Sequence, residues 1–425
     1  MPLFLFEPTF INRESNIAAV MSGLSSWKAD HQLRIPNLAK ARRQMEGNGI
    51  PGELRKNEPF VYGSFFEERI GRNYSMVTER IFGNLPSGEE AHIYHIENAA
   101  GAYIEVSQYG AILVNVCVPD KDGRLTDVVL GYDDLESYFV NGCFFGACIG
   151  RSGNRIADSR FMLDGTEIKL TPNEGKNNLH SGPDGFEKKL WNASAVEGQN
   201  AVTFSRISPD GENGYPGEFE VSVTYELTEE NAVRIVYSGV SDKITVANMT
   251  NHSYFNLNGE GSGTAMDQYL TIHAQEYTPV REDSIPLGEN ASVEGTPMDF
   301  RTAKQIGRDI EADFEQLKFT GGFDHNYVTD GYNKASIREI ASAWSEKSGI
   351  QMDVLTDCPC VQFYAANFVE DEYGKNGHVY NKREAFCLET QVEPNAVNVE
   401  NFHSPVLEAG EKYYSETVYR FSVRK

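Results

Sequence analysis

The sequence predicts an all-β protein built from antiparallel sheets that pack as a large sandwich. Apolar and polar residues alternate over 221–227, and this period of two is typical of a half-buried strand. The same alternation recurs over 233–237 and 413–423. Clusters rich in Gly, Asn and Asp separate the runs, at 119–123, 164–165, 211–214 and 258–261. Short strands separated by such turns favour an antiparallel sandwich over alternating strands and helices.

The N-terminal part differs in composition from the rest of the chain. Residues 1–75 hold ten basic and eight acidic side chains, a net charge of +2, whereas the remainder carries −26. Good helix formers occupy 37–46, and a run of helix breakers follows at 47–52. We therefore predict a short, partly helical extension of unknown role over residues 1–78 and one domain over residues 79–425.

Two short helices are expected within the β-rich domain. The segments 134–138 and 302–306 each combine helix-forming residues with a polar residue suited to a helix start. Neither is long enough to change the predicted fold class.

Charge and length limit the kinds of partner and the location. The 425-residue chain has a net charge of −24, which repels phosphate backbones and anionic lipid surfaces, so nucleic acid and membranes are not expected partners. A neutral small molecule would be indifferent to this field. No apolar run approaches the ~20 residues of a membrane helix, and the start of the chain lacks the basic region of a signal peptide. The sequence predicts a cytoplasmic protein.

The six cysteines are spread thinly and do not form a disulfide framework. Cys358-Pro359-Cys360 has one intervening residue, so it matches neither zinc-ribbon nor thioredoxin spacing. We expect the cysteines to be small buried side chains.

Five polar stretches concentrate the residues that could carry chemistry. They are, in order, GRSGNRI at 150–156, LHSG at 179–182, NHSYFNL at 251–257, GFDHNY at 322–327 and CLETQ at 387–391. Together they resemble the aldose 1-epimerases (galactose mutarotases), over about 350 residues from Glu79 onward. The resemblance implies a galactose-mutarotase-like β-sandwich with an open cleft. It also implies a small-molecule aldose substrate, galactose or glucose, and no cofactor or metal.

Interconversion of sugar anomers requires one base and one acid. The base removes the proton of the C1 hydroxyl while the acid protonates the ring oxygen, and the roles reverse on closure. Glu389 lies in a largely apolar run, where desolvation would raise its basicity, although the local pattern also fits a capped strand-end glutamate. His252 could equally be a satisfied polar core residue, but histidine has the pKa nearest neutrality. The resemblance assigns Glu389 as the base and His252 as the acid.

The resemblance also assigns sugar-binding roles to Asn154, Arg155, His180, Asp324 and Gln362. Arginine presents a planar fork of donors that can fix sugar oxygens or hold a carboxylate, although an ordinary loop ion pair is an alternative.

The chain departs from the family pattern near two of these residues. Ser181 stands where relatives often have glycine, and Ala365-Ala366 replaces a more usual Thr-Gly before Asn367.

Three other interpretations of the same residues stay open at the level of sequence. His180, His252, Asp324 and Glu389 could hold a metal, although no two have the close spacing of a zinc motif. Asp324 and Glu389 could form a glycosidase pair, which would leave the histidine motif unexplained. The scaffold could also be a non-catalytic carbohydrate-binding domain, or an epimerase of a related, modified aldose.

Overall fold

Strands predominate in the computed structural model, which describes residues 76–334 and 336–424. The helix expected over 37–46 and the breakers at 47–52 lie outside the described residues. The first described strand, β1 (Met76–Asn84), spans the boundary expected near residue 78 and pairs with the next strand. The division of the chain into an extension and one domain stays a prediction.

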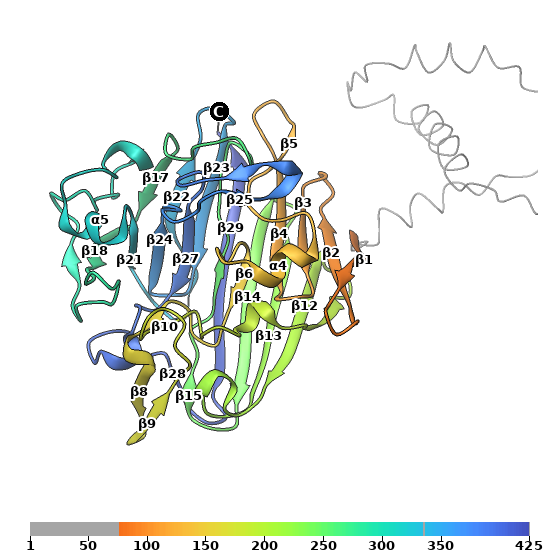
Figure 1. Ribbon diagram of the computed structural model, residues 1–425. Coiled ribbons are helices and arrows are strands. Elements are labelled where there is room, and N and C mark those ends of the chain that lie inside the picture. Colours follow the sequence, from red (N-terminus) through yellow and green to blue (C-terminus); the bar gives the residue numbers. More distant parts are fainter. Residues whose placement is uncertain (1–75, 335, 425) are drawn as a thin grey trace, which may run out of the picture. The chain divides into compact units, whose positions relative to one another are not determined.

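The largest sheet has nine antiparallel strands and runs through the middle of the domain (Figure 1). Their spatial order is β11 (Asn192–Ala195), β12 (Ala201–Ser208), β13 (Phe219–Leu227), β14 (Ala232–Ser241), β29 (Lys412–Val423), β23 (Ile350–Thr356), β22 (Arg338–Trp344), β17 (Tyr269–Ile272) and β20 (Lys304–Gln305). The expected alternation at 221–227 is realised in β13, where every second side chain is buried. The runs predicted at 233–237 and 413–423 are β14 and β29, which pair with each other.

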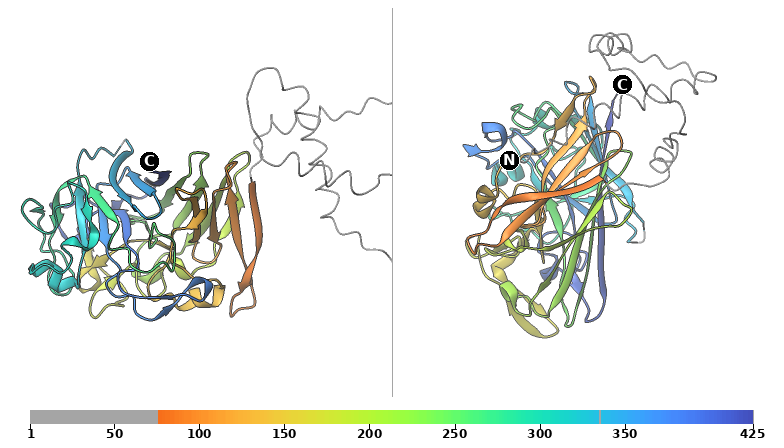
Figure 2. Two further views of the ribbon diagram at one scale, coloured as in Figure 1. Left: turned by 90° about the horizontal axis from the view of Figure 1, so that it is seen from above. Right: turned by 90° about the vertical axis from the view of Figure 1, so that its right-hand side faces the viewer.

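Two five-stranded antiparallel sheets pack on the same, buried face of this sheet, one toward the right and the other toward the left of Figure 1, and Figure 2 gives two further views. One contains β1, β2 (Glu90–Glu97), β3 (Tyr103–Ser107), β4 (Ile112–Pro119) and β5 (Leu125–Asp127), in that order. The other has the order β19 (Ala291–Ser292), β18 (Ala274–Thr278), β21 (Asp324–Thr329), β24 (Cys360–Tyr364) and β27 (Cys387–Gln391). The main hydrophobic core is shared by all three sheets, with contributions such as Val116, Val223 and Phe363. The predicted all-β fold is confirmed.

Smaller elements connect the sheets. The two-stranded pairs are β6 (Ala147–Ile149) with β16 (Thr250–His252), β7 (Arg155–Ile156) with β10 (Asn178–Leu179), β8 (Arg160–Leu163) with β9 (Thr166–Lys169), β15 (Thr245–Val246) with β28 (Val406–Leu407), and β25 (Glu372–Tyr373) with β26 (Val379–Tyr380). Single 3-10 turns occur at η1 (Ala157–Ser159), η2 (Phe186–Lys188), η3 (Glu212–Gly214), η4 (Ile306–Arg308), η5 (Lys375–Gly377) and η6 (Ala396–Asn398). No helix among residues 76–334 and 336–424 has the length and apolar character needed to cross a membrane.

One of the two expected helices is present, and the prediction of the other is wrong. The helix α4 (Leu135–Val140) starts at Asp134, whose carboxylate accepts a hydrogen bond from the Ser137 N–H at 2.9 Å, a typical N-cap. Residues 302–306 instead contribute β20, which pairs with β17, and the start of η4. The buried ammonium of Lys304 contacts the Pro297 carbonyl oxygen and Asp309, and this tertiary pairing overrides helix propensity.

A second α-helix, α5 (Glu315–Thr320), was not expected. The buried side chain of Gln316 in its first turn exchanges two hydrogen bonds with the backbone of Val280, and Gly321 ends it in the left-handed conformation. These contacts link residues distant in sequence, which explains why the local pattern did not show the helix.

Candidate active site

All seven residues that the sequence singled out line one cavity of about 180 Å³. They are Asn154, Arg155, His180, His252, Asp324, Gln362 and Glu389. The volume is below the roughly 300–1,000 Å³ of sites for drug-sized ligands, so the cavity suits a small molecule.

The register of one sheet aligns three of these residues. Gln362 on β24 is directly opposite Glu389 on β27. On the other side of β24, Gln362 donates a hydrogen bond of 2.7 Å from its amide to the Asp324 carboxylate at the start of β21. Because antiparallel neighbours lie close together, residues far apart in the chain become one polar surface.

The pairing of β7 with β10 joins a second group. Arg155 pairs with Leu179, so His180 lies next to Asn154. The His180 N–H donates to the Asn154 carbonyl oxygen at 3.1 Å, and the Asn154 N–H donates to His180 Nδ1 at 3.2 Å. Because Nδ1 accepts the second bond, the proton of the neutral His180 imidazole is on Nε2.

Ser181, the first departure from the family pattern, stabilises this loop. Its hydroxyl accepts a hydrogen bond from the Ser152 N–H at 2.7 Å and donates one to the Ser152 carbonyl oxygen at 3.0 Å. Ser181 has a φ of 69°, a conformation that favours glycine. The hydroxyl contacts supply a reason for the serine there.

His252 ends β16, and its backbone pairs with Ala147 on β6. The preceding Asn251 anchors the strand, because its side-chain amide donates to the Gly146 carbonyl oxygen at 3.0 Å. His252 is buried and its ring lies among three aromatic rings, those of Phe144, Tyr254 and Tyr364, with centroids 5.2–6.3 Å away.

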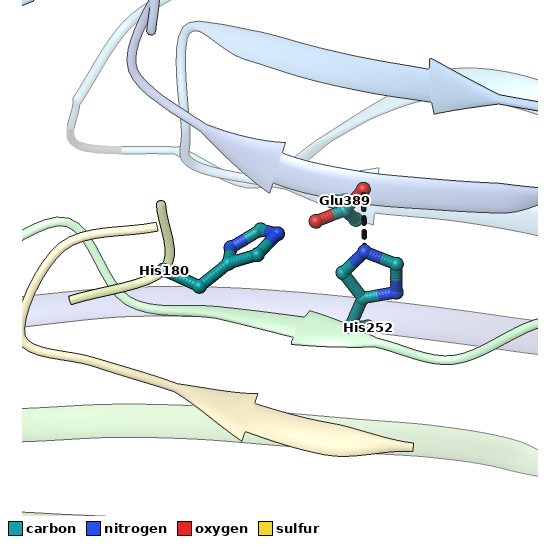
Figure 3. A group of neighbouring side chains, drawn as sticks. All are labelled: His180, His252 and Glu389. Atoms are coloured by element: carbon teal, nitrogen blue, oxygen red, sulfur yellow. Dashed lines mark ion pairs between the residues drawn. The ribbon is translucent and has the colours of Figure 1, made fainter. Parts of the chain in front are cut away.

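Glu389 and His252 approach each other in the floor of the cavity. The distance from His252 Nε2 to Glu389 Oε1 is 3.6 Å, and the side chain of His180 points toward the same place (Figure 3). Glu389 Oε2 is buried without a hydrogen-bond partner in the protein. An unsatisfied buried carboxylate oxygen beside a histidine is costly for stability and is typical of a functional group.

Burial shifts the pKa of both groups toward the uncharged form. It raises the pKa of Glu389 well above its usual range, with a further increase from Asp324 that Arg155 opposes. Burial also lowers the pKa of His252 to about 4. Burial therefore favours the uncharged pair, with the proton on Glu389 rather than on His252.

Glu174 is a member of the site that sequence reasoning missed. Its carboxylate accepts two hydrogen bonds from Arg155, at 2.7 Å from Nε and 2.8 Å from Nη2, and it lines the cavity. Burial would lower the pKa of Arg155, but Asp324 and Glu174 outweigh it and raise that pKa. A lone glutamate in a loop gives no sequence signal, because its partner is known only after folding.

An aromatic and thiol rim was also missed. The cavity is lined in addition by Cys143, Phe144, Tyr254, Tyr364 and Phe368, and Phe368 is 65% exposed. Aromatic side chains next to polar ones are suited to the apolar faces of a small polar ring compound.

The three residues His180, His252 and Glu389 could also hold a metal ion, since one ligand atom of each lies within 4.8 Å of the others. Two imidazoles and a carboxylate form a donor set that zinc accepts. The expectation that the site works without a metal or other cofactor stays a prediction.

Comparison with known proteins places the chain among enzymes of sugar chemistry. The family model described as "Aldose 1-epimerase" matches residues 92–420. Galactose mutarotase of Bos taurus is 42% identical over 348 residues, which are 82% of this chain and 99% of the relative. Aldose 1-epimerase of Escherichia coli (strain K12) is 37% identical over 79% of this chain and 96% of its own length.

Solved structures agree with these matches. A crystal structure of an aldose epimerase homologue from C. elegans is 31% identical, with a TM-score of 0.72, and the match covers 78% of this chain and 98% of that one. Galactose 1-epimerase from Lactobacillus acidophilus has a TM-score of 0.72 at 28% identity, covering 83% of this chain and all of that one.

Proposed function

The chain belongs to the aldose 1-epimerase family, and from this premise we propose how its site interconverts the α and β anomers of a free hexose. The protein is a carbohydrate isomerase that acts on a small-molecule sugar. Galactose and glucose are the proposed substrates, because the relatives are named galactose mutarotases and aldose 1-epimerases. The observation that carries the proposed mechanism is the convergence of Glu389 and His252 within 3.6 Å in a small buried cavity.

Glu389 acts as the base and His252 as the acid in ring opening. The carboxylate accepts the proton of the C1 hydroxyl while the imidazolium donates a proton to the ring oxygen. Both oxygens are bonded to C1, so two groups 3.6 Å apart can reach them at the same time. After rotation about the C1–C2 bond, Glu389 returns its proton to the aldehyde oxygen and His252 recovers one from the C5 hydroxyl. The other anomer results, and no covalent intermediate forms.

The shifted pKa values favour the open-chain stage. Once the ring has opened, Glu389 is protonated and His252 is neutral, which is the state that burial favours. The reactive state, with a Glu389 carboxylate and a His252 imidazolium, has the same number of protons as the uncharged state, and the two states differ only in which group holds the proton. Burial makes both groups more reactive as donor and acceptor, because their charged forms are less stable than in water.

The remaining residues orient the sugar. Asp324 and Gln362 are hydrogen-bonded to each other and offer an acceptor and a donor to ring hydroxyls. Arg155, held by Glu174, extends a fixed guanidinium toward the cavity, and His180 presents its Nε2 proton. Asn154 also lines the cavity and fixes His180 through its backbone, and its side-chain oxygen accepts a hydrogen bond from the Arg155 N–H at 2.9 Å.

The remaining partner and location proposals rest on charge and composition. We propose a cytoplasmic enzyme without nucleic-acid or membrane partners, because its net charge of −24 repels polyanions.

Polarimetry tests the proposed function directly. Freshly dissolved α-D-galactose and α-D-glucose should reach the same final rotation with and without protein, but faster with it. Unchanged rates across aldoses that still bind would indicate a carbohydrate-binding domain. Release of reducing sugar from a methyl glycoside would indicate a hydrolase.

A further inference from the structure

A second cluster of metal-ligating side chains lies outside the active-site cavity. Cys360 begins β24, Glu393 follows the end of β27, and His403 precedes β28. One ligand atom of each lies within 4.8 Å of the other two. None of the three lines the active-site cavity. Three connected parts of the fold therefore meet at one group of a thiol, a carboxyl and an imidazole.

Glu393 and His403 are already in contact. His403 Nδ1 lies 3.1 and 3.0 Å from the two carboxylate oxygens of Glu393, and the His403 main-chain N–H donates to Oε2 at 3.1 Å. Glu393 is buried, whereas the His403 side chain is 37% exposed. Burial would raise the pKa of Glu393, but the contacts with His403 outweigh it and lower that pKa. A carboxylate anion is thus held below the surface.

The Cys360 thiol is fully buried beside this anion. Burial raises its pKa well above the usual range, and Glu393 raises it further. Burial therefore favours the protonated thiol in the metal-free protein, and the thiolate forms only when a bound metal ion stabilises it.

We propose that Cys360, Glu393 and His403 bind a borderline-soft divalent transition metal, with Zn²⁺ as the best fit. Thiolate, imidazole and carboxylate are the three ligand types that zinc takes in proteins, whereas Mg²⁺ and Ca²⁺ take oxygen ligands. Tetrahedral bonds of about 2.0–2.3 Å place neighbouring ligand atoms roughly 3.3–3.8 Å apart. His403 Nδ1 and the Glu393 oxygens are 3.0–3.1 Å apart, slightly closer than this spacing, and all three ligand atoms lie within 4.8 Å of one another, so small side-chain movements would bring them to it.

His403 connects the cluster to a cavity at the surface. A cavity of about 190 Å³ is lined by His403, Cys358 and Asp357, among other residues. An ion can enter there from the exposed side of His403. Neither Cys360 nor Glu393 lines this cavity, so a water molecule beside His403 would complete a tetrahedral shell.

Binding exchanges protons for metal bonds. The Cys360 thiol releases its proton to solvent, and a His403 nitrogen exchanges its contact with Glu393 for a bond to the metal. Affinity therefore rises with pH over the range in which the thiol would otherwise be protonated. The bound ion would tie β24 to the segments that follow β27 and precede β28, and it would stabilise the folded chain against unfolding.

Titration of the full-length, chelator-treated protein with Co²⁺ tests the proposal. The expected result is a thiolate-to-cobalt charge-transfer absorption in the near ultraviolet that saturates at one ion per chain and that Zn²⁺ abolishes. Cys360→Ser should lose this absorption. His403→Ala should weaken binding at least about tenfold.

Matched variants separate this cluster from the active site. Cys387 Sγ lies 3.8 Å from His252 Nδ1, so Cys387→Ser tests whether the signal comes from that site instead. The proposal requires that the absorption survives in Cys387→Ser and disappears in Cys360→Ser. A wild-type protein without saturable absorption, or a signal that follows Cys387, would overturn it. The outcome does not depend on the proposed isomerase activity.

Discussion

Replacement of Glu389 by glutamine gives the sharpest test of the proposed mechanism. The amide preserves the shape of the side chain but cannot accept the C1 hydroxyl proton. Glu389 Oε2 has no hydrogen-bond partner in the protein, and Oε1 lies 3.6 Å from His252, so few protein contacts change. Loss of one proton-transfer group costs roughly 10²–10⁴ in rate. We expect Glu389→Gln to reduce kcat by at least about 100-fold, or about 2.7 kcal/mol of transition-state stabilisation, with a modest change in KM.

Polarimetric initial rates across a range of α-D-galactose concentrations give kcat and KM for each variant. Glu187→Gln is the matched control, because Glu187 is also buried with both carboxylate oxygens lacking a partner, but it does not line the cavity. The control should retain wild-type kcat. A wild-type kcat in Glu389→Gln would refute the assignment of Glu389 as the base.

Three further predictions follow from the site and its surroundings. The pH profile of kcat/KM should fall on the acid side near pH 4, where His252 becomes protonated in addition to Glu389. It should also fall on the alkaline side, where Glu389 loses its proton above its raised pKa. An acid limb near the ordinary histidine pKa would contradict this prediction. Arg155→Ala should raise KM at least about tenfold and Glu174→Gln less, because Glu174 acts through Arg155; equal KM values for both variants and wild type would count against a sugar-binding arginine. Burial raises the pKa of Glu187 to about 7, so its ionisation destabilises the fold; this destabilisation is absent below the unfolded-state pKa and complete above pH 7. Glu187→Gln should therefore raise the unfolding free energy at pH 8 by up to about 3 kcal/mol, and with it the Tm, but should have no such effect at pH 4. Equal gains in Tm at both pH values would contradict this prediction.

Sequence patterns predicted the strands well where one face is buried. The alternation at 221–227 and 413–423 became β13 and β29, because burial of one face fixes a period of two along each strand. The pattern failed at 302–306 and 315–320. There, pairing of β20 with β17 and hydrogen bonds between Gln316 and Val280 decided the conformation, and both involve partners distant in the chain.

The candidate site shows the same division. The family motifs identified His252, Glu389 and the five proposed sugar-binding residues, since each lies in a local run that resembles the aldose 1-epimerases. Glu174 was not among the residues that these motifs singled out, and only the folded chain brings it to Arg155 and the cavity.

The sequence alone thus determined the fold class and the family, and it indicated the residues proposed for proton transfer, because alternation and short motifs are local properties of a chain. The tertiary structure decided that Glu389 and His252 lie 3.6 Å apart, that Glu174 holds Arg155, and that Cys360, Glu393 and His403 come together. The physical reason is that pKa shifts, ion pairs and ligand clusters depend on burial and on distances between atoms, and these are set by how sheets register and pack rather than by neighbours in sequence.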